Sequence, residues 1–259
     1  MSSRTRGFSL IELVVVIAVI AMFAALLAPA AFESIESSRE ASTEAQIQRA
    51  FLSIVGDPST GNFGYLGDMG RLPTVLTELV TQGAQTAWHT ADSGTDHKGL
   101  VGTGWRGPYV TGGEVTADLF RDAWGQTLTY SSGQITSHGP DGQLATIGDN
   151  IVYPVQTPVQ TTGTIIVTVI VNEIPQPGGL TVRVYSTSNG EQGAAVTQTT
   201  TTPSAGLPFR FTVPHGTSVI ETSHTAGSTT VTRTTTIDVG AGTQLSRTIV
   251  MKTSATVAM

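Results

Sequence analysis

The sequence predicts an α+β protein in three parts: a long N-terminal helix, a small α/β head and an all-β sandwich. Three observations lead to this fold class. An apolar stretch, Leu13–Phe32, continues directly into an amphipathic segment with helical spacing. A Gly-rich region with several aromatic residues follows. From Val155 the chain is rich in threonine, with valine and isoleucine at alternate positions, which is typical of strands.

Composition narrows the functional classes. A net charge of −6 argues against a nucleic-acid surface, and the absence of cysteine excludes disulfides, thiolate metal sites and thiol nucleophiles. No G-x-S-x-G, H-E-x-x-H, P-loop or paired-carboxylate motif is present. The five histidines are scattered, which favours surface or structural roles for them. We therefore expect a protein that is not an enzyme.

The N-terminal helix is predicted to span residues 8–55. The stretch Leu13–Phe32 has no charge and, at ~1.5 Å per residue, crosses one hydrocarbon core. Arg4 and Arg6 precede it, which places the N-terminus in the cytoplasm and the bulk of the chain on the other side of the membrane that bounds it. A simple signal anchor or a cleaved signal peptide is the alternative, but it leaves Glu12 unexplained, because a carboxylate near the membrane is costly.

The same helix is predicted to continue into the aqueous phase. Ile47, Ala50 and Ile54 recur at helical spacing, and Pro58 cannot continue a helix, so the end is expected near residue 55. Pro29 lies inside the helix and is expected to kink or loosen it.

The head is predicted to cover residues 56–153. We expect a loop over 57–72, a short helix over 74–80, a polar loop over 82–104, and two antiparallel strands over 126–130 and 133–136. The polar loop contains His89, Asp92, Asp96 and His97. Their spacing matches no metal motif with a known mechanism, so a solvated loop is the favoured interpretation over a metal cluster. The aromatic residues are expected to form the core: Trp105, Tyr109, Phe120, Trp124 and Tyr130.

A linker over 154–163 is predicted to lead to the sandwich, 164–259. The alternation of apolar residues favours strands over a disordered threonine-rich stalk. Seven strands are expected, at 164–171, 180–186, 194–199, 208–213, 217–223, 229–239 and 244–252.

The segment Arg6-Gly7-Phe8-Ser9-Leu10-Ile11-Glu12 resembles the processing site of type IV pilins and type II secretion pseudopilins. The resemblance implies that a prepilin peptidase removes the leader 1–7 by cutting after Gly7, and that Phe8 is then N-methylated. It also implies that Glu12 is the assembly residue. Pro29 falls where many members of the family have a helix-loosening proline.

Four further segments resemble the major, G-type pseudopilin of type II secretion: Gly70–Val80, Arg106–Val110, Asp122–Gly125 and Ser137–Gly142. The resemblance covers about residues 4–153. It implies a homo-oligomeric helical filament, an inner-membrane assembly platform, minor pseudopilins as partners, and a calcium loop with Asp141 and Asp149. A β-turn at Asp141-Gly142 is the alternative for that segment. The loop has fewer acids than the family's loop, and about 105 residues follow it.

The C-terminal part resembles transthyretin-like, carboxypeptidase-regulatory or Ig-like sandwiches, most clearly at Phe209–Thr217. This identifies a fold class without a ligand. Two functions remain open. One is a pseudopilin of a secretion filament in the periplasm. The other is a type IV pilin of a surface pilus, with the sandwich as an adhesive or ligand-binding module.

Overall fold

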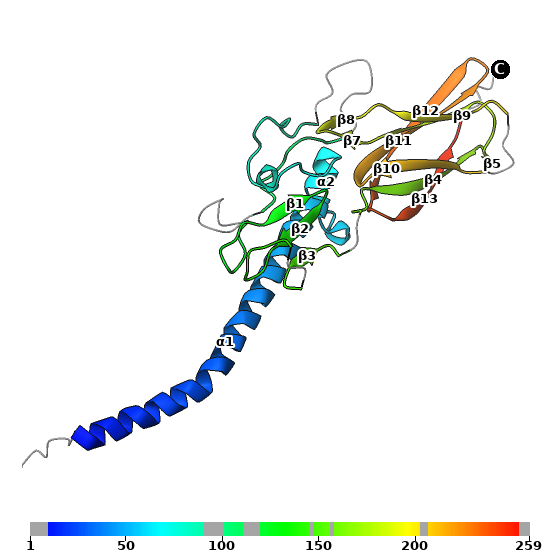
Figure 1. Cartoon of the computed structure of the whole chain (residues 1–259). Helices are drawn as coiled ribbons and strands as arrows, with labels where there is room; N and C mark the ends of the chain where they lie inside the picture. The colour runs from blue at the N-terminus through cyan, green and yellow to red at the C-terminus, as the bar shows by residue number, and fades with distance from the viewer. Residues whose placement is uncertain are drawn as a thin grey trace, which may run out of the picture.

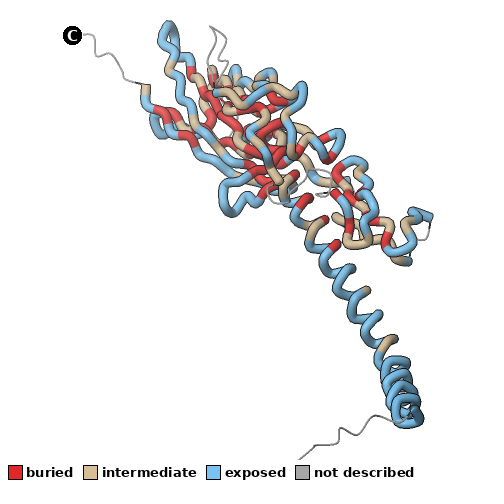
Figure 2. The backbone as a smooth tube through the Cα atoms, turned by 90° about the vertical axis from the view of Figure 1, so that its left-hand side faces the viewer, coloured by how far each residue is buried: buried red, intermediate tan, exposed pale blue. Residues whose placement is uncertain are grey.

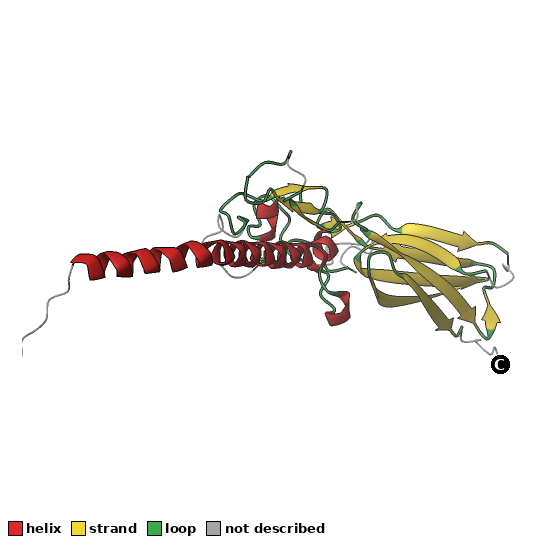
Figure 3. Ribbon diagram, turned by 60° about the horizontal axis from the view of Figure 1, so that its bottom comes forward, coloured by secondary structure: helices red, strands yellow, loops and turns green. Residues whose placement is uncertain are grey.

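The computed structural model describes residues 10–90, 101–110, 120–145, 148–155, 158–202 and 207–253. Helix α1 (Leu10–Val55) leads into a small head, and a β-sandwich lies beyond the C-terminal end of this helix (Figure 1). Helix, head and sandwich follow one another along the long axis of the molecule (Figure 3). The predicted α+β class, with a long apolar N-terminal helix followed by sheets, is confirmed.

The surroundings of α1 change along its length. Its N-terminal half is exposed nearly throughout (Figure 2), and it is long and apolar enough to cross a membrane. Near its end Thr43, Ile47, Ala50 and Ile54 are buried, and their spacing places them on one face of the helix. Gly56 ends the helix in the left-handed region, with φ 72°. The helix continues through Pro29 and bends part-way along (Figure 1).

The head packs on the last turns of α1. Its elements are η1 (Pro58–Thr60), α2 (Gly64–Met69), η2 (Leu76–Leu79) and an antiparallel sheet of β1 (Thr129–Ser131), β2 (Gln134–Ser137) and β3 (Ile151–Tyr153). The predicted hairpin is confirmed, and its turn is formed by Ser132 and Gly133, both with positive φ. Strand β3 was not expected, because three residues are too few to show a period.

The prediction of a loop over 57–72 is wrong at α2. All six residues of this helix are buried, so packing stabilises it despite two glycines of low helix propensity. A Cβ atom on Gly64 would lie 2.6 Å from the backbone nitrogen of Gly56, so this close approach requires glycine. The short helix expected over 74–80 is a 3₁₀-helix over Leu76–Leu79.

The sandwich consists of two four-stranded sheets packed face to face. One has the order β10 (Phe209–Pro214), β4 (Thr162–Val171), β13 (Gln244–Met251), with β5 (Ile174–Pro175) also on β4. The other has the order β12 (Thr229–Val239), β11 (Gly216–Ala226), β6 (Leu180–Tyr185), β9 (Val196–Thr200). A short hairpin, β7 (Thr187–Ser188) and β8 (Glu191–Gln192), projects from it. Strands β4 and β13 are parallel, and the other pairs are antiparallel.

All seven predicted strands are present, with ends shifted by at most a few residues. Strand β4 shows why: every second residue from Gly163 to Val171 is buried, as its sequence alternation predicts. The inward residues of both sheets form one core. Strands β5, β7 and β8 have two residues each and leave no periodic signal.

The sandwich contacts the head through the β10–β11 corner, through the β7–β8 hairpin, and through Val101, which packs with Tyr185 and Val219. The corner between β10 and β11 packs on the end of α1 and on α2, where His215 Nε2 lies 2.8 Å from the carbonyl oxygen of Val55. The β7–β8 hairpin packs on the other side of α2, where the Gly190 amide donates to the Met69 carbonyl (2.8 Å). The two parts therefore share a continuous contact surface, which we call the seam.

Candidate functional site: the N-terminal helix and the head

The beginning of α1 carries Glu12, the residue for which a role in assembly is predicted. Glu12 lies in the first turn of α1 and is exposed, among apolar side chains such as Leu10, Ile11 and Leu13 that are 55–81% exposed. Gly7 and Phe8 lie outside the described residues. So much exposed apolar surface on one helix requires a membrane or neighbouring helices to cover it.

A buried aspartate holds the head on α1. Asp122 accepts hydrogen bonds from the Trp124 and Gln126 amides and from the Ser137 hydroxyl (2.6 Å). The turn that it forms reaches the helix twice. The Ala123 amide donates to Thr43 Oγ1 (3.0 Å). Trp124 Nε1 donates to Glu36 Oε1 (2.8 Å).

Trp124 does not belong to the hydrophobic core of the head, in contrast to the prediction. It is half-buried and anchors the head to a helix position 88 residues away. No local pattern around Asp122-Ala123-Trp124-Gly125 shows such a partner.

The segment Gly70–Val80 forms a network around Glu78. Arg71 Nη1 lies 2.9 Å from Glu78 Oε2, and the hydroxyls of Tyr65 and Thr74 also donate to this carboxylate. Burial alone would raise the pKa of Glu78, but the hydrogen bonds from Thr74, Tyr65 and Arg71 outweigh it and lower that pKa. Burial and the bond to Glu78 raise the pKa of the Tyr65 phenol.

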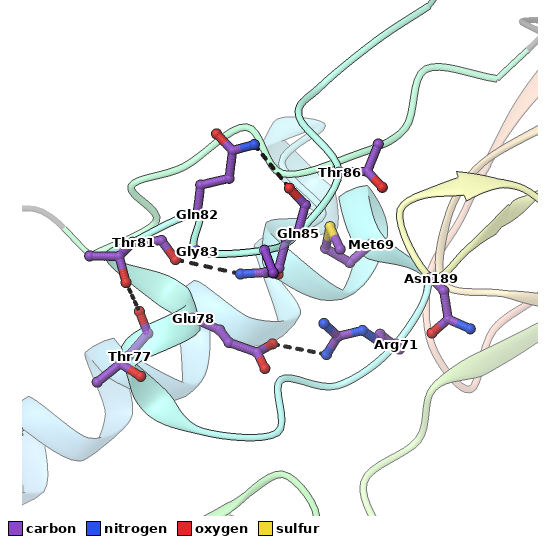
Figure 4. A pocket seen from close by; sticks show the side chains of 11 residues that line it. Met69, Arg71, Thr77, Glu78, Thr81, Gln82, Gly83, Gln85, Thr86 and Asn189 are labelled. Carbon is purple, nitrogen blue, oxygen red and sulfur yellow. Dashed lines mark hydrogen bonds and ion pairs between the residues drawn. The ribbon is translucent and has the colours of Figure 1, made fainter.

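Beside this network lies a cavity of about 460 Å³ (Figure 4). It opens between the head and the β7–β8 turn, and its walls carry hydroxyls, carboxamides and the paired Arg71 and Glu78. Gln85 is held at both its side chain and its backbone: its Oε1 lies 2.6 Å from the Tyr65 hydroxyl oxygen, and Gln82 Nε2 donates to its carbonyl (2.9 Å).

The segment Arg106–Val110 forms a second polar cluster around Asp68 of α2. This carboxylate is buried, lies 3.2 Å from Arg106 Nη2 and accepts from the Tyr109 hydroxyl (3.0 Å). Burial raises its pKa, although Arg106 and Tyr109 act in the opposite direction. The Arg106 guanidinium also lies over the Trp88 ring, 4.5 Å from its centroid. The cluster holds the 101–110 segment against α2.

The two residues implied for calcium have different surroundings. Asp141 is exposed in a turn closed by the Gly142 amide on the Gly139 carbonyl (3.3 Å), and its Oδ1 accepts from the Gln143 amide. Asp149 Oδ1 and Asn150 Oδ1 are buried, and among the described residues neither has a hydrogen-bond partner. Oxygens of this kind are the ligands that Ca²⁺ takes. Asp149 and Asn150 each present one such oxygen, and Asp141 lies in the turn that closes at Gly142.

Of the four polar-loop residues considered for a metal, only His89 lies within the described part of the chain. His89 Nε2 lies 3.2 Å from Glu191 Oε2 on β8, and His89 Nδ1 lies 3.0 Å from the Ala87 carbonyl oxygen. Asp92, Asp96 and His97 lie outside the described residues. Within the described ranges no group of three or more histidine, aspartate or glutamate side chains could hold a metal.

Comparison with known proteins identifies the N-terminal segment. Residues 2–28 match the family described as the prokaryotic N-terminal methylation motif. This range includes Gly7, Phe8 and Glu12. None of the curated proteins matches the chain.

Proposed function

We propose that this chain, a type IV pilin-like prepilin by its N-terminal methylation motif, is a pseudopilin of a type II secretion filament. The observation that carries the proposal is α1 itself. Its exposed apolar half holds one acidic residue, Glu12, which lies four residues along the sequence from the terminus that processing would create. The head segments around Glu78, Asp68 and Asp122 support the narrower assignment to a G-type pseudopilin.

Processing changes the chemistry of the N-terminus. Hydrolysis of the Gly7–Phe8 peptide bond by a prepilin peptidase removes the basic leader and leaves an amine on Phe8, which is then methylated. Phe8 and Glu12 are four residues apart, so the amine and carboxylate of one helix can face the same side. In a bundle of such helices the carboxylate of one subunit meets the amine of its neighbour.

This pair would set the register between subunits. In an apolar bundle the attraction depends strongly on position, and leaving either charge unpaired costs several kcal/mol. The remaining apolar surface of α1 then packs on identical helices, which gives an open helical filament through heterologous contacts. Pro29 lets each helix bend to follow the filament. The partners are other copies of the chain, the peptidase, the inner-membrane assembly platform and minor pseudopilins.

Two measurements test the proposal. Mass spectrometry of the mature protein should find a chain that begins at methylated Phe8. Glu12→Leu should still insert into the membrane but lose ordered filaments, whereas Glu40→Leu, a matched change on the exposed aqueous part of α1, should assemble normally. Normal filaments from Glu12→Leu would contradict the role given to the carboxylate.

A surface pilus is the second candidate, and one feature of the sandwich favours it. Thr232, Ser223, Thr181 and Thr199 are directly paired across all four strands of one sheet, so their hydroxyls share its outer face. Such a row suits an adhesive or ligand-binding module. Long fibres outside the cell in micrographs would favour the pilus, and filaments that depend on secretion components would favour the pseudopilus.

We also propose that the loop around Asp149 binds calcium. The two unpartnered oxygens of Asp149 and Asn150 support it. Backbone carbonyls of the loop and water would complete the six to eight oxygen ligands that the ion takes. When bound, the ion would cross-link the loop to β3, because Ile151 follows Asn150 directly.

A further inference from the structure

The seam between head and sandwich is centred on one buried histidine. His215 lies between β10 and β11 and is 2% exposed. Its backbone amide donates to the Thr161 carbonyl (2.8 Å), and the Phe63 ring packs edge-on against it at 5.2 Å between centroids. The imidazole thus touches the end of α1, the loop before α2 and the sandwich at once.

The partners of the ring define its protonation state. The Val55 carbonyl oxygen, 2.8 Å from Nε2, can only accept, so Nε2 carries a hydrogen. The Ala241 amide, 2.9 Å from Nδ1, can only donate, so Nδ1 must accept. The neutral tautomer protonated at Nε2 satisfies both bonds, whereas a second proton on Nδ1 would face the Ala241 N–H.

Acidification therefore costs the seam a hydrogen bond and buries a charge. The C-terminal end of α1 favours a positive charge, which offsets part of the cost. Burial, the larger effect, lowers the pKa of His215 below its usual value despite the bonds to Val55 and Phe63.

The charged groups of the surrounding segments do not offset the effect of burial on His215. Asp57 follows α1 and accepts from Ser59; Asp68 of α2 is paired with Arg106; Asp238 of β12 accepts from Thr217. None of these carboxylates, among the described contacts, is bonded to the imidazole.

The second contact of the seam also contains a histidine. The His89 ring lies between the Ala87 carbonyl and the Glu191 carboxylate on β8. The β7–β8 hairpin stays attached through backbone bonds, such as Gly190 to Met69, that do not titrate.

We propose that the seam is a pH-sensitive hinge: neutral His215 clamps the sandwich to the end of α1, and acidification releases this clamp while the β7–β8 contact holds. The sandwich then swings about the hairpin instead of detaching.

The test uses the full chain in detergent micelles with two nitroxide labels. Because the chain has no cysteine, Ala84→Cys on the head and Thr248→Cys on β13, both exposed, give the only labelled sites. We expect a narrow distribution of label distances at pH 8, and at least a doubling of its width at pH 5, with the midpoint below pH 6.5.

His215→Gln provides the matched variant, because its amide offers a donor and an acceptor without titrating. It should keep the narrow distribution at both pH values, and circular dichroism should show intact strands in all samples. His224→Gln changes the other buried histidine of the sandwich and should keep the native pH response. An unchanged width in the native chain at pH 5, or equal broadening in native and His215→Gln proteins, would overturn the proposal.

Discussion

The backbone of Gly216 lies directly against that of Gly67. A Cβ atom on Gly216 would come within 2.9 Å of both the Cα and the carbonyl oxygen of Gly67, and Gly216 has φ 122°. Neither the space nor the backbone conformation admits another residue. This contact brings β11 onto α2 and allows His215, one residue earlier, to reach Val55.

Gly216→Ala should therefore weaken the seam. The clash and the strained backbone together cost about 1–3 kcal/mol. Calorimetry of the full chain should show a lower Tm. Gly148→Ala, where a Cβ atom meets nothing within 4 Å, is the control and should leave the Tm nearly unchanged. Equal stability of the two variants would show that the backbones separate without cost.

Removal of the sandwich should destabilise the head. The fragment Met1–Tyr153 would expose the surfaces of Phe63 and Met69, which are 8% and 1% exposed in the full chain. Each covered side chain contributes up to about 1.5–3 kcal/mol. We expect the head to unfold at a lower temperature and to bind a hydrophobic dye. A fragment that melts like the full chain and forms normal filaments would show that the sandwich is an independent appendage.

Glu78→Gln should destabilise the head at neutral pH. The variant loses the charge-assisted bond to Arg71 and weakens those from Tyr65 and Thr74, at a cost of roughly 1–3 kcal/mol. Because the pKa of Glu78 is lowered, its contribution is complete above its ordinary pKa of 4.5 and disappears as pH falls below that value. The Tm gap between native and variant should therefore narrow from pH 7 to pH 3.5. Glu40→Gln on exposed α1 should show no such gap.

Calcium should stabilise the loop at Asp149. Chelation is expected to lower the Tm of the native chain by a few degrees, since a bound ion stabilises only the folded state. Asp149→Ala should abolish the response, and Asp141→Ala should preserve it, because Asp141 lies in its own turn. If chelation leaves the Tm of the native chain unchanged, calcium does not bind at this loop.

Some elements of the fold can be predicted from the sequence and others cannot, and the difference has a physical cause. The strands of the sandwich were predictable because alternate burial imposes a period of two on the sequence, as in β4. The end of α1 was predictable because Gly56 and Pro58 are local signals. Helix α2 was not, because it is stabilised by packing and its glycines argue against it.

The long-range partners could not be found from local patterns. Nothing beside Trp124 indicates Glu36, and nothing beside His215 indicates Val55, 160 residues earlier. His215 fell within a segment singled out only as a sandwich edge. The acidic positions of the sequence do not indicate Asn150 in the proposed calcium site, although a side-chain amide oxygen is among the ligands that Ca²⁺ takes.

Strands β4 and β13, the first and last long strands of the sandwich, are paired in parallel, and this pairing determines how the domain resists a pulling force. The chain enters the sandwich at Thr162 on β4, and β13 pairs alongside it from Gln244↔Thr164 to Met251↔Val171. A pull along the molecule, between α1 and the far end of β13, loads these hydrogen bonds in shear. They must then yield together, whereas a pull across the strands would open them one at a time. The sandwich is thus built to bear tension along the direction in which the helix points.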